Sequence, residues 1–320
     1  IYKPKVMKLN LLITGGLGYI GSFTAKNFLK KMKKKLFVVD NLSRGNFFAK
    51  KYSNNYILDI SNDKLNKIIE KKKINTIIHL ASFTCVRESI RKKNKYLKNF
   101  NSQIKFINNI KKTNVKYFIF SSSLSVYEKN KYKKNLSPYS MYKLKIEKYL
   151  KTVSSKDFKV IILRYPNIIG SDPSGKLGEK NDFISRIVPL FYKNLLKMKK
   201  NTLYYDYNKK IYPYRNYMHV DDISNINLKV VENLGKFKNK YQIFNIKNKK
   251  EYSNFEVLDS LSIIMKKKPL IDLKQINNKE SIQQIINSKN DILKIIKYNI
   301  KYKDLKKILQ TNSKWFKKIY

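Results

Sequence analysis

A glycine-rich turn near the N-terminus constrains the fold of this chain more than any other feature. The apolar run 11–13 leads through Thr14 into Gly15, Gly18 and Gly21, and a segment with helical periodicity follows. In a dinucleotide-binding fold the first glycine permits a tight turn, the second lets the backbone approach a pyrophosphate, and the third lets helix and strand pack closely. Glycine turns also occur in many other folds, so the motif needs support from the rest of the chain.

A second apolar run supplies that support. Val38 and Val39 precede Asp40, which follows Gly21 by 19 residues. An acidic side chain at this distance hydrogen-bonds the adenosine ribose in such folds, so Asp40 favours NAD over NADP. Arg44 stands close by, and an arginine near this position accommodates the extra phosphate of NADP, so both cofactors stay open at this point.

The charge of the chain is strongly positive, at +48, with 70 Lys and Arg against 22 Asp and Glu. Such a balance ordinarily suggests a partner that is a polyanion. However, only six of the basic residues are arginine, and the lysines are scattered over the whole length. Lys, Asn, Ile and Tyr all have codons built from A and T, so genome base composition explains the pattern. We expect weak, salt-sensitive attraction to polyanions and no specific nucleic-acid function.

The rest of the sequence argues against a membrane-spanning helix, a secretory signal, an intrachain disulfide and a metal site. No apolar run approaches the 18 residues of a membrane-spanning helix, and residues 1–5 lack the apolar core of a secretory signal. Residues 1–6 are expected to be a tail before Met7. The single cysteine, Cys85, excludes an intrachain disulfide and fits a cytoplasmic location. With only two histidines in the chain, we expect no metal site.

The hydrophobic pattern predicts an α/β fold with a doubly wound parallel sheet, the Rossmann architecture. Short apolar runs alternate with longer segments of helical period, as in strand–helix–strand units. We expect residues 7–166 to form a Rossmann NAD-binding domain. Residues 167–320 are expected to form mainly a smaller substrate-binding α/β domain, with segments that return to the sheet. The predicted strands are 9–14, 36–39, 55–58, 76–80, 116–121 and 159–164, and the predicted helices are 19–33, 62–72, 88–112 and 138–152.

A serine, a tyrosine and a lysine suggest hydride chemistry. Ser123 is the last of three serines that follow the apolar run 117–120, so it lies at the carboxyl end of a strand, where open parallel sheets bind ligands. Tyr139 and Lys143 are four residues apart on a helix for which Ser137 is a good cap and Pro138 a good first residue. A free tyrosine, with a pKa of about 10, is a poor base at neutral pH. A lysine ammonium beside it favours the phenolate.

This arrangement predicts an oxidation of a substrate hydroxyl. Tyr139 would take the hydroxyl proton while a nicotinamide cofactor takes hydride from the same carbon. Ser123 would hydrogen-bond the oxygen and hold it in line. A Tyr–Lys pair at helical spacing is usually a simple surface pair, so the prediction depends on all three motifs together.

In these motifs the chain resembles the extended short-chain dehydrogenase/reductase superfamily and, within it, the UDP-galactose 4-epimerases. The likeness runs along nearly the whole chain, and its epimerase-like stretches are 86–89 and 173–179. The resemblance implies interconversion of UDP-galactose and UDP-glucose by transient oxidation at C4, with an NAD that stays bound. It also implies a possible homodimer, formed by helices 88–112 and 138–152. The superfamily motifs lie at residues 14–22, 38–43, 77–82, 118–123, 163–167 and 215–220.

The same resemblance implies roles for individual residues. By position, the catalytic residues would be Ser123, Tyr139 and Lys143, and no metal is implied. The UDP-sugar would be bound by Ser123, Tyr139, Asn167, Arg186 and Arg215, although Asn167 also suits a loop cap and Arg215 a surface cation. The NAD would be bound by Gly15, Gly18, Tyr19, Ile20, Asp40, Asn41, Asp59, Ile60, Leu80, Ala81, Ser82, Asn99, Ser121, Tyr139, Lys143 and Tyr165.

Three positions depart from the family pattern, and rival functions remain. Thr84 stands where the family usually has lysine, and Arg186 stands where it has asparagine. An aromatic residue of the family aligns near Asp206, although Tyr205 or Tyr207 could serve in its place. A 4,6-dehydratase or decarboxylase would carry an acid just after the catalytic serine, where this chain has Leu124 and Ser125. Two more rival functions are an epimerase for a related sugar nucleotide and an NAD-binding or polyanion-binding protein without turnover.

Overall fold

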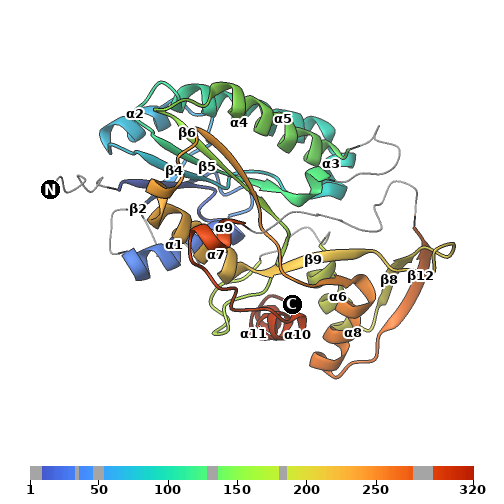
Figure 1. Ribbon diagram of the computed structural model, residues 1–320. Coiled ribbons are helices and arrows are strands. Elements are labelled where there is room, and N and C mark those ends of the chain that lie inside the picture. The colour runs from blue at the N-terminus through green and yellow to red at the C-terminus, as the bar shows by residue number, and fades with distance from the viewer. Residues whose placement is uncertain (1–8, 33–35, 46–53, 128–135, 180–185, 277–290) are drawn as a thin grey trace.

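A seven-stranded parallel sheet forms the centre of the molecule (Figure 1). The computed structural model describes residues 9–32, 36–45, 54–127, 136–179, 186–276 and 291–320. The strand order is β10-β6-β5-β4-β1-β2-β3, the 3-2-1-4-5-6 order of nucleotide-binding sheets with β10 added at one edge. The predicted doubly wound parallel sheet is therefore confirmed. Its strands are β1 (Leu11–Thr14), β2 (Leu36–Asp40), β3 (Asn54–Ile57), β4 (Thr76–His79), β5 (Tyr117–Ser123), β6 (Lys159–Tyr165) and β10 (Tyr241–Asn245).

Helices cover both faces of this sheet, because side chains alternate along each buried strand. On β1, Leu11 and Ile13 belong to one apolar cluster and Leu12 to the other. The helices α1 (Tyr19–Met32) and α7 (Val220–Glu232) pack on the first face. On the second face lie α2 (Lys64–Lys71), α4 (Lys93–Ile110) and α5 (Pro138–Val153).

The prediction of one continuous helix over 88–112 is wrong. The segment expected to form a single helix over 88–112 forms α3 (Val86–Arg91) and α4, and the chain breaks between them at Lys92 (φ −118°, ψ 55°). After the break, the Tyr96 hydroxyl binds the backbone of Cys85 and the carboxylate of Glu88. Neither glycine nor proline marks this bend, so the periodicity alone gave no signal of it.

The second half of the chain forms a smaller α/β assembly beside the end of the large sheet (Figure 1). Its core includes Phe191, Tyr217 and Trp315, all buried. Two elements of this half, α7 and β10, lie on the large sheet. The division of the chain at residue 166 stays a prediction, and the predicted tail 1–6 lies outside the described residues. The elements of this half are β7 (Asn167–Ile169), α6 (Ile187–Leu196), β8 (Lys200–Tyr205), β9 (Tyr214–His219), η3 (Leu234–Lys236), β11 (Glu251–Ser253), α8 (Asn254–Met265), β12 (Leu270–Gln275), α9 (Asp291–Ile295), α10 (Leu305–Gln310) and α11 (Asn312–Ile319).

None of the helices within the described ranges is long and apolar enough to cross a membrane. In the same ranges, His, Cys, Asp and Glu side chains do not gather in threes as a metal ion would need.

Candidate active site

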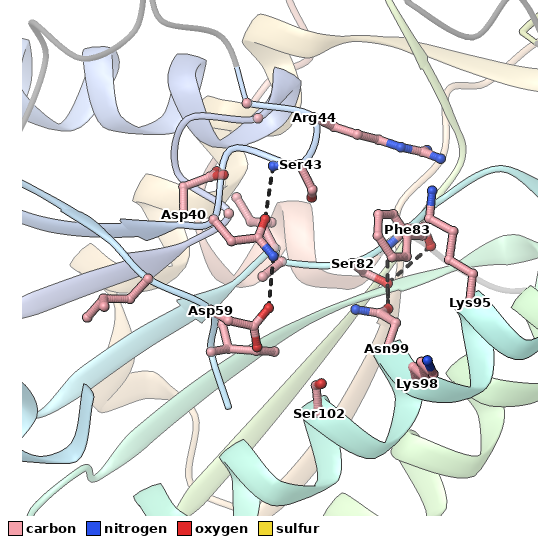
Figure 2. Close-up of a pocket in the computed structure, with 18 of the residues that line it drawn as sticks. Asp40, Ser43, Arg44, Asp59, Ser82, Phe83, Lys95, Lys98, Asn99 and Ser102 are labelled. Atoms are coloured by element: carbon pink, nitrogen blue, oxygen red, sulfur yellow. Dashed lines mark hydrogen bonds between the residues drawn. The ribbon is translucent and has the colours of Figure 1, made fainter. Parts of the chain in front are cut away.

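A cavity of about 530 Å³ opens where β1, β2 and β4 end (Figure 2). In open parallel sheets, ligands bind at the carboxyl ends of the strands, where the strand order reverses, and β1 and β4 flank that point here. Ten of the residues predicted to bind the cofactor line this cavity: Gly15, Gly18, Asp40, Asn41, Asp59, Ile60, Leu80, Ala81, Ser82 and Asn99.

The glycine turn packs so closely against neighbouring backbone that a side chain would clash at two of its positions. Gly15 has a φ of +67°, and a Cβ there would lie 2.7 Å from the backbone nitrogen of Ala81. A Cβ on Gly21 would lie 2.1 Å from the carbonyl oxygen of Gly15. The turn leads directly into α1, whose first N–H groups suit an anionic pyrophosphate.

Asp40 is held at the edge of the cavity by backbone groups. Its carboxylate accepts hydrogen bonds from the N–H of Leu17 (3.0 Å) and of Leu42 (2.8 Å). Burial raises the pKa of Asp40, and these backbone groups partly offset that rise. Beside it, the Asn41 amide donates to Asp59 at 2.8 Å. Asp40 is therefore fixed in place at the edge of the cavity, and its role in binding a ribose hydroxyl stays a prediction.

Arg44 points away from Asp40 (Figure 2). Its guanidinium forms an ion pair with Glu88 and lies 5.0 Å from the centre of the Phe83 ring. Lys95 binds the same carboxylate at 2.9 Å and lies 4.1 Å from the same ring centre. Because Arg44 is paired with a carboxylate, the arrangement favours an unphosphorylated ribose at Asp40.

One wall of the cavity was not predicted from the sequence. Lys95, Lys98 and Ser102 of α4 line it together with Asn99. Their spacing of i, i+3, i+4 and i+7 is that of one helix face, so the pattern carried a usable signal. Phe83 lines the cavity from the loop after β4, where no periodicity marks it.

The catalytic candidates lie on β5, which ends at Ser123, and on the buried face of α5. Ser137 caps α5 by accepting a hydrogen bond from the N–H of Ser140 at 3.2 Å, and Tyr139 and Lys143 follow on one buried face. The Lys143 ammonium donates to the carbonyl oxygen of Ser121 at 2.7 Å. Burial lowers the pKa of Lys143 to about 7, so its charge depends strongly on its surroundings.

A series of hydrogen bonds between serines joins Ser123 to the start of α5. The N–H of Ser125 donates to Ser123 Oγ at 3.2 Å, and Ser140 Oγ lies 2.9 Å from Ser125 Oγ. Ser137 Oγ lies 3.0 Å from Ser140 Oγ. The serine and the helix that carries Tyr139 are thus held together by short polar contacts.

His79 lies below this site, buried on β4, with Nδ1 2.7 Å from Thr14 Oγ1 and Nε2 3.3 Å from Gln103 Oε1. Burial lowers its pKa to about 3, and the nearby Lys143 charge acts in the same direction. The ring is therefore neutral at physiological pH.

In the part of the chain that the structure describes, six predicted cofactor residues are not among those that line the cavity: Tyr19, Ile20, Ser121, Tyr139, Lys143 and Tyr165. Tyr19 donates its hydroxyl to the carbonyl oxygen of Gly170 at 2.5 Å, and Tyr165 donates to Asn227 at 2.6 Å. Both tyrosines thereby join the first half of the chain to the second. Their roles stay predictions, as do those of Ile20, Ser121, Tyr139 and Lys143.

Arg186 and Thr84, two of the departures from the family pattern, contact each other. Arg186 Nη2 donates to Thr84 Oγ1 at 2.8 Å, and Arg186 Nε pairs with Glu179 at 3.0 Å. Burial opposes the charge of Arg186, but Glu179 and the nearby Tyr19 and Tyr139 favour it, so the pKa of Arg186 is raised. The indole of Trp315 donates to the Glu179 carbonyl at 2.8 Å, so α11 holds this group in place.

The remaining substrate candidates lie on neighbouring strands. β7 and β9 pair in parallel, and the Asn167 amide donates to the carbonyl oxygen of Asn216 at 3.4 Å. Arg215 follows on from Tyr214, whose carbonyl it binds at 2.8 Å. Asp206, the third departure, caps a turn by accepting hydrogen bonds from two backbone N–H groups.

Comparison with known proteins gives a consistent picture. Residues 11–247 match the NAD dependent epimerase/dehydratase family. A UDP-glucose 4-epimerase from Lactobacillus helveticus is 30% identical over 267 residues, which cover 79% of this chain and 80% of that protein.

Solved structures extend the likeness over almost the whole chain. The UDP-glucose 4-epimerase of Bifidobacterium longum in complex with NAD+ and UDP has a TM-score of 0.85 at 24% identity, covering 97% of this chain and 98% of that one. The UDP-Glc/GlcNAc 4-epimerase of Campylobacter jejuni has a TM-score of 0.80 at 26% identity, covering 97% and 99%.

Proposed function

The chain belongs to the NAD dependent epimerase/dehydratase family, and from this we propose that it interconverts UDP-galactose and UDP-glucose with a tightly bound NAD. The matches confirm the resemblance seen in the sequence. The observation that carries the function is the placement of Tyr139 and Lys143 on the buried face of α5, beside the end of β5. A tyrosine base, with a lysine and a serine beside it, can serve the oxidation of a sugar hydroxyl.

Each of these residues has a distinct task in the proposed reaction. Tyr139 takes the proton of the sugar 4-hydroxyl and later returns it. Ser123 hydrogen-bonds the same oxygen and fixes its direction. Lys143 supplies the positive charge that favours the Tyr139 phenolate. A bound NAD, which the residues at the ends of β1, β2 and β4 would hold, would supply a reversible hydride acceptor for C4, so the overall reaction would involve no net oxidation.

The residues after Ser123 argue against elimination of water from the sugar. Leu124 and Ser125 are both buried, and neither offers the acid that a dehydratase uses at this place. The Campylobacter jejuni relative is a UDP-Glc/GlcNAc 4-epimerase, so an N-acetylated sugar nucleotide is the second substrate to test. We also propose a cytoplasmic role in galactose metabolism and a homodimer formed through α4 and α5.

The proposed function is tested by assaying the purified protein with UDP-galactose and no added NAD. We expect UDP-glucose to form, because the cofactor is retained. Tyr139→Phe removes the proton-accepting oxygen and should lower turnover by about 10³-fold while NAD stays bound. A wild type that fails to act on UDP-galactose even with NAD supplied would contradict the proposal. Equal turnover in both proteins would remove Tyr139 from the mechanism.

A further inference from the structure

The buried face of α5 continues beyond Tyr139 and Lys143 to a third polar residue. Glu147 follows at the same spacing of four residues, and its exposure is only 2%. Its carboxylate accepts a hydrogen bond from the hydroxyl of Ser122, just as Lys143 binds the carbonyl of Ser121. Two consecutive residues of β5, directly before Ser123, are therefore attached to this helix.

Arg164 of β6 holds Glu147 from the other side. Its Nε donates to Glu147 Oε1 at 3.0 Å, and its Nη2 donates to Oε2. Arg164 lies opposite Ser122 in the register of the sheet. Its Nη1 also donates to the hydroxyl of Tyr127. Tyr127 is the last residue of the 3₁₀ turn η2 (Leu124–Tyr127). The ion pair thus connects the chain on both sides of Ser123.

A buried ion pair of this kind is poorly explained by stability alone. Burial removes the hydration of both charges, and apolar residues of similar volume often stabilise a fold equally well. Glu147, however, lies one helical turn from Lys143, whose ammonium is also buried. An anion at that distance favours the charged form of the lysine.

The other groups around Lys143 do not supply this negative charge. His79 on β4 is neutral, and Gln103 from α4, which binds His79, has no charge. Arg164 on β6 is positive. On α5, Tyr139 becomes negative only as it takes part in the reaction. In the described part of the chain, Glu147 is the carboxylate that opposes the loss of the Lys143 proton.

We propose that Glu147 is a positioning residue for the epimerase reaction: its carboxylate, held by Arg164, keeps Lys143 protonated and keeps Ser123 aligned beside Tyr139. The inference rests on the proposed function and assigns a role to a residue that does not itself touch the substrate. A purely structural Glu147 would affect folding and leave the charge of Lys143 unchanged.

Glu147→Gln separates these two roles, because glutamine keeps the volume and removes the charge. Without the carboxylate, Lys143 gives up its proton at a lower pH. We expect the alkaline limb of the kcat–pH profile to move by about one pH unit toward acid. Glu147→Asp retains the charge, so its alkaline limb should stay where the wild-type limb lies.

A second variant protects this test against misfolding, since Glu147→Gln leaves the Arg164 charge buried without its partner. The double variant Glu147→Gln, Arg164→Met removes both charges and keeps the volume. Because loss of the Arg164 charge by itself favours protonation of Lys143, the reference protein is Arg164→Met. The alkaline limb of the double variant should lie at a lower pH than that of Arg164→Met, and coincident limbs in these two folded proteins would overturn the inference.

A double-mutant cycle on the free energy of unfolding tests whether Glu147 stabilises the charged form of Lys143, and it needs no activity assay. Lys143→Met and Glu147→Gln are combined, and the free energies of unfolding of the four proteins are measured in urea at pH 6 and pH 9. We expect a favourable coupling between the two positions at pH 6 that largely disappears at pH 9, where Lys143 is neutral. Absence of coupling at pH 6 would refute the inference. Failure of the wild type to act on UDP-galactose would instead refute the proposed function.

Discussion

This site has a proposed cofactor side, around Gly15, Asp40 and Ser82, and a proposed substrate side, around Thr84, Glu179 and Arg186. The two sides are built in different ways. On the cofactor side, the loops after β1, β2 and β4 bring Gly15, Asp40 and Ser82 together at one edge of a single sheet. On the substrate side, contacts join segments that are far apart in the chain. Arg186 binds Thr84 across 102 residues, and Trp315 binds Glu179 across 136. Changes to the cofactor side should therefore act locally, whereas the substrate side should respond to changes far from the chemistry.

The largest expected effect comes from the glycine turn. Gly15→Ala puts a side chain at a φ of +67° and within 2.7 Å of the backbone of Ala81. Strain and crowding together should lower the free energy of unfolding by about 3 kcal/mol. We also expect loss of retained NAD, measured by absorbance of the protein after gel filtration.

Gly235→Ala is the matched control for this change. A Cβ at Gly235 has no atom within 4 Å, so stability and retained NAD should both stay at the wild-type level. If Gly15→Ala retained its stability and its NAD as this control does, the close packing of Gly15 against Ala81 would not be needed for NAD binding.

A smaller effect is expected on the substrate side. Arg186→Gln removes the ion pair with Glu179 and weakens the contact with Thr84. Hydrogen bonds to charged groups contribute about 1.5–3 kcal/mol, and partial exposure of Arg186 reduces this. We expect the KM for UDP-galactose to rise about tenfold while retained NAD is unchanged.

Two further variants sharpen this result. Arg91 is an exposed arginine, and Arg91→Gln should leave the KM unchanged. Trp315→Phe removes the hydrogen bond to the Glu179 carbonyl and should raise the KM to a lesser extent than Arg186→Gln. Loss of retained NAD from Arg186→Gln would contradict the assignment of Arg186 to the substrate side alone.

The smallest effect is expected at the mouth of the cofactor cavity. Arg44 and Glu88 form an ion pair between the loop after β2 and helix α3, and both side chains are partly exposed. Such pairs contribute up to about 1 kcal/mol, so Arg44→Gln should speed NAD dissociation by up to about fivefold. Stopped-flow displacement of NAD measures this rate.

Lys105→Gln provides the comparison for Arg44→Gln. It breaks a more exposed ion pair, between Lys105 and Asp63 at 3.0 Å, which lies outside the cavity. This variant should release NAD at the wild-type rate. Equal rates for all three proteins would show that the Arg44–Glu88 pair does not help to retain the cofactor.

The two sides also differ in how well the sequence predicted them. Ten predicted cofactor residues line one cavity, because glycine and acid spacings are set within one or two elements. The two-helix structure of 86–110 was missed, because the break at Lys92 has no glycine or proline. The contact between Thr84 and Arg186 was also missed, since each position departs from the family pattern by itself.

Local chemistry in the sequence determined the alternation of strands and helices, the glycine turn, the Tyr139–Lys143 helix face and the family. These features depend on spacings of a few residues, which backbone geometry converts directly into position. Only the tertiary structure decided that Arg44 turns to Glu88, and that Glu147 and Arg164 enclose the end of β5. Charged side chains on different elements choose their partners through burial and packing, and a linear pattern does not record either.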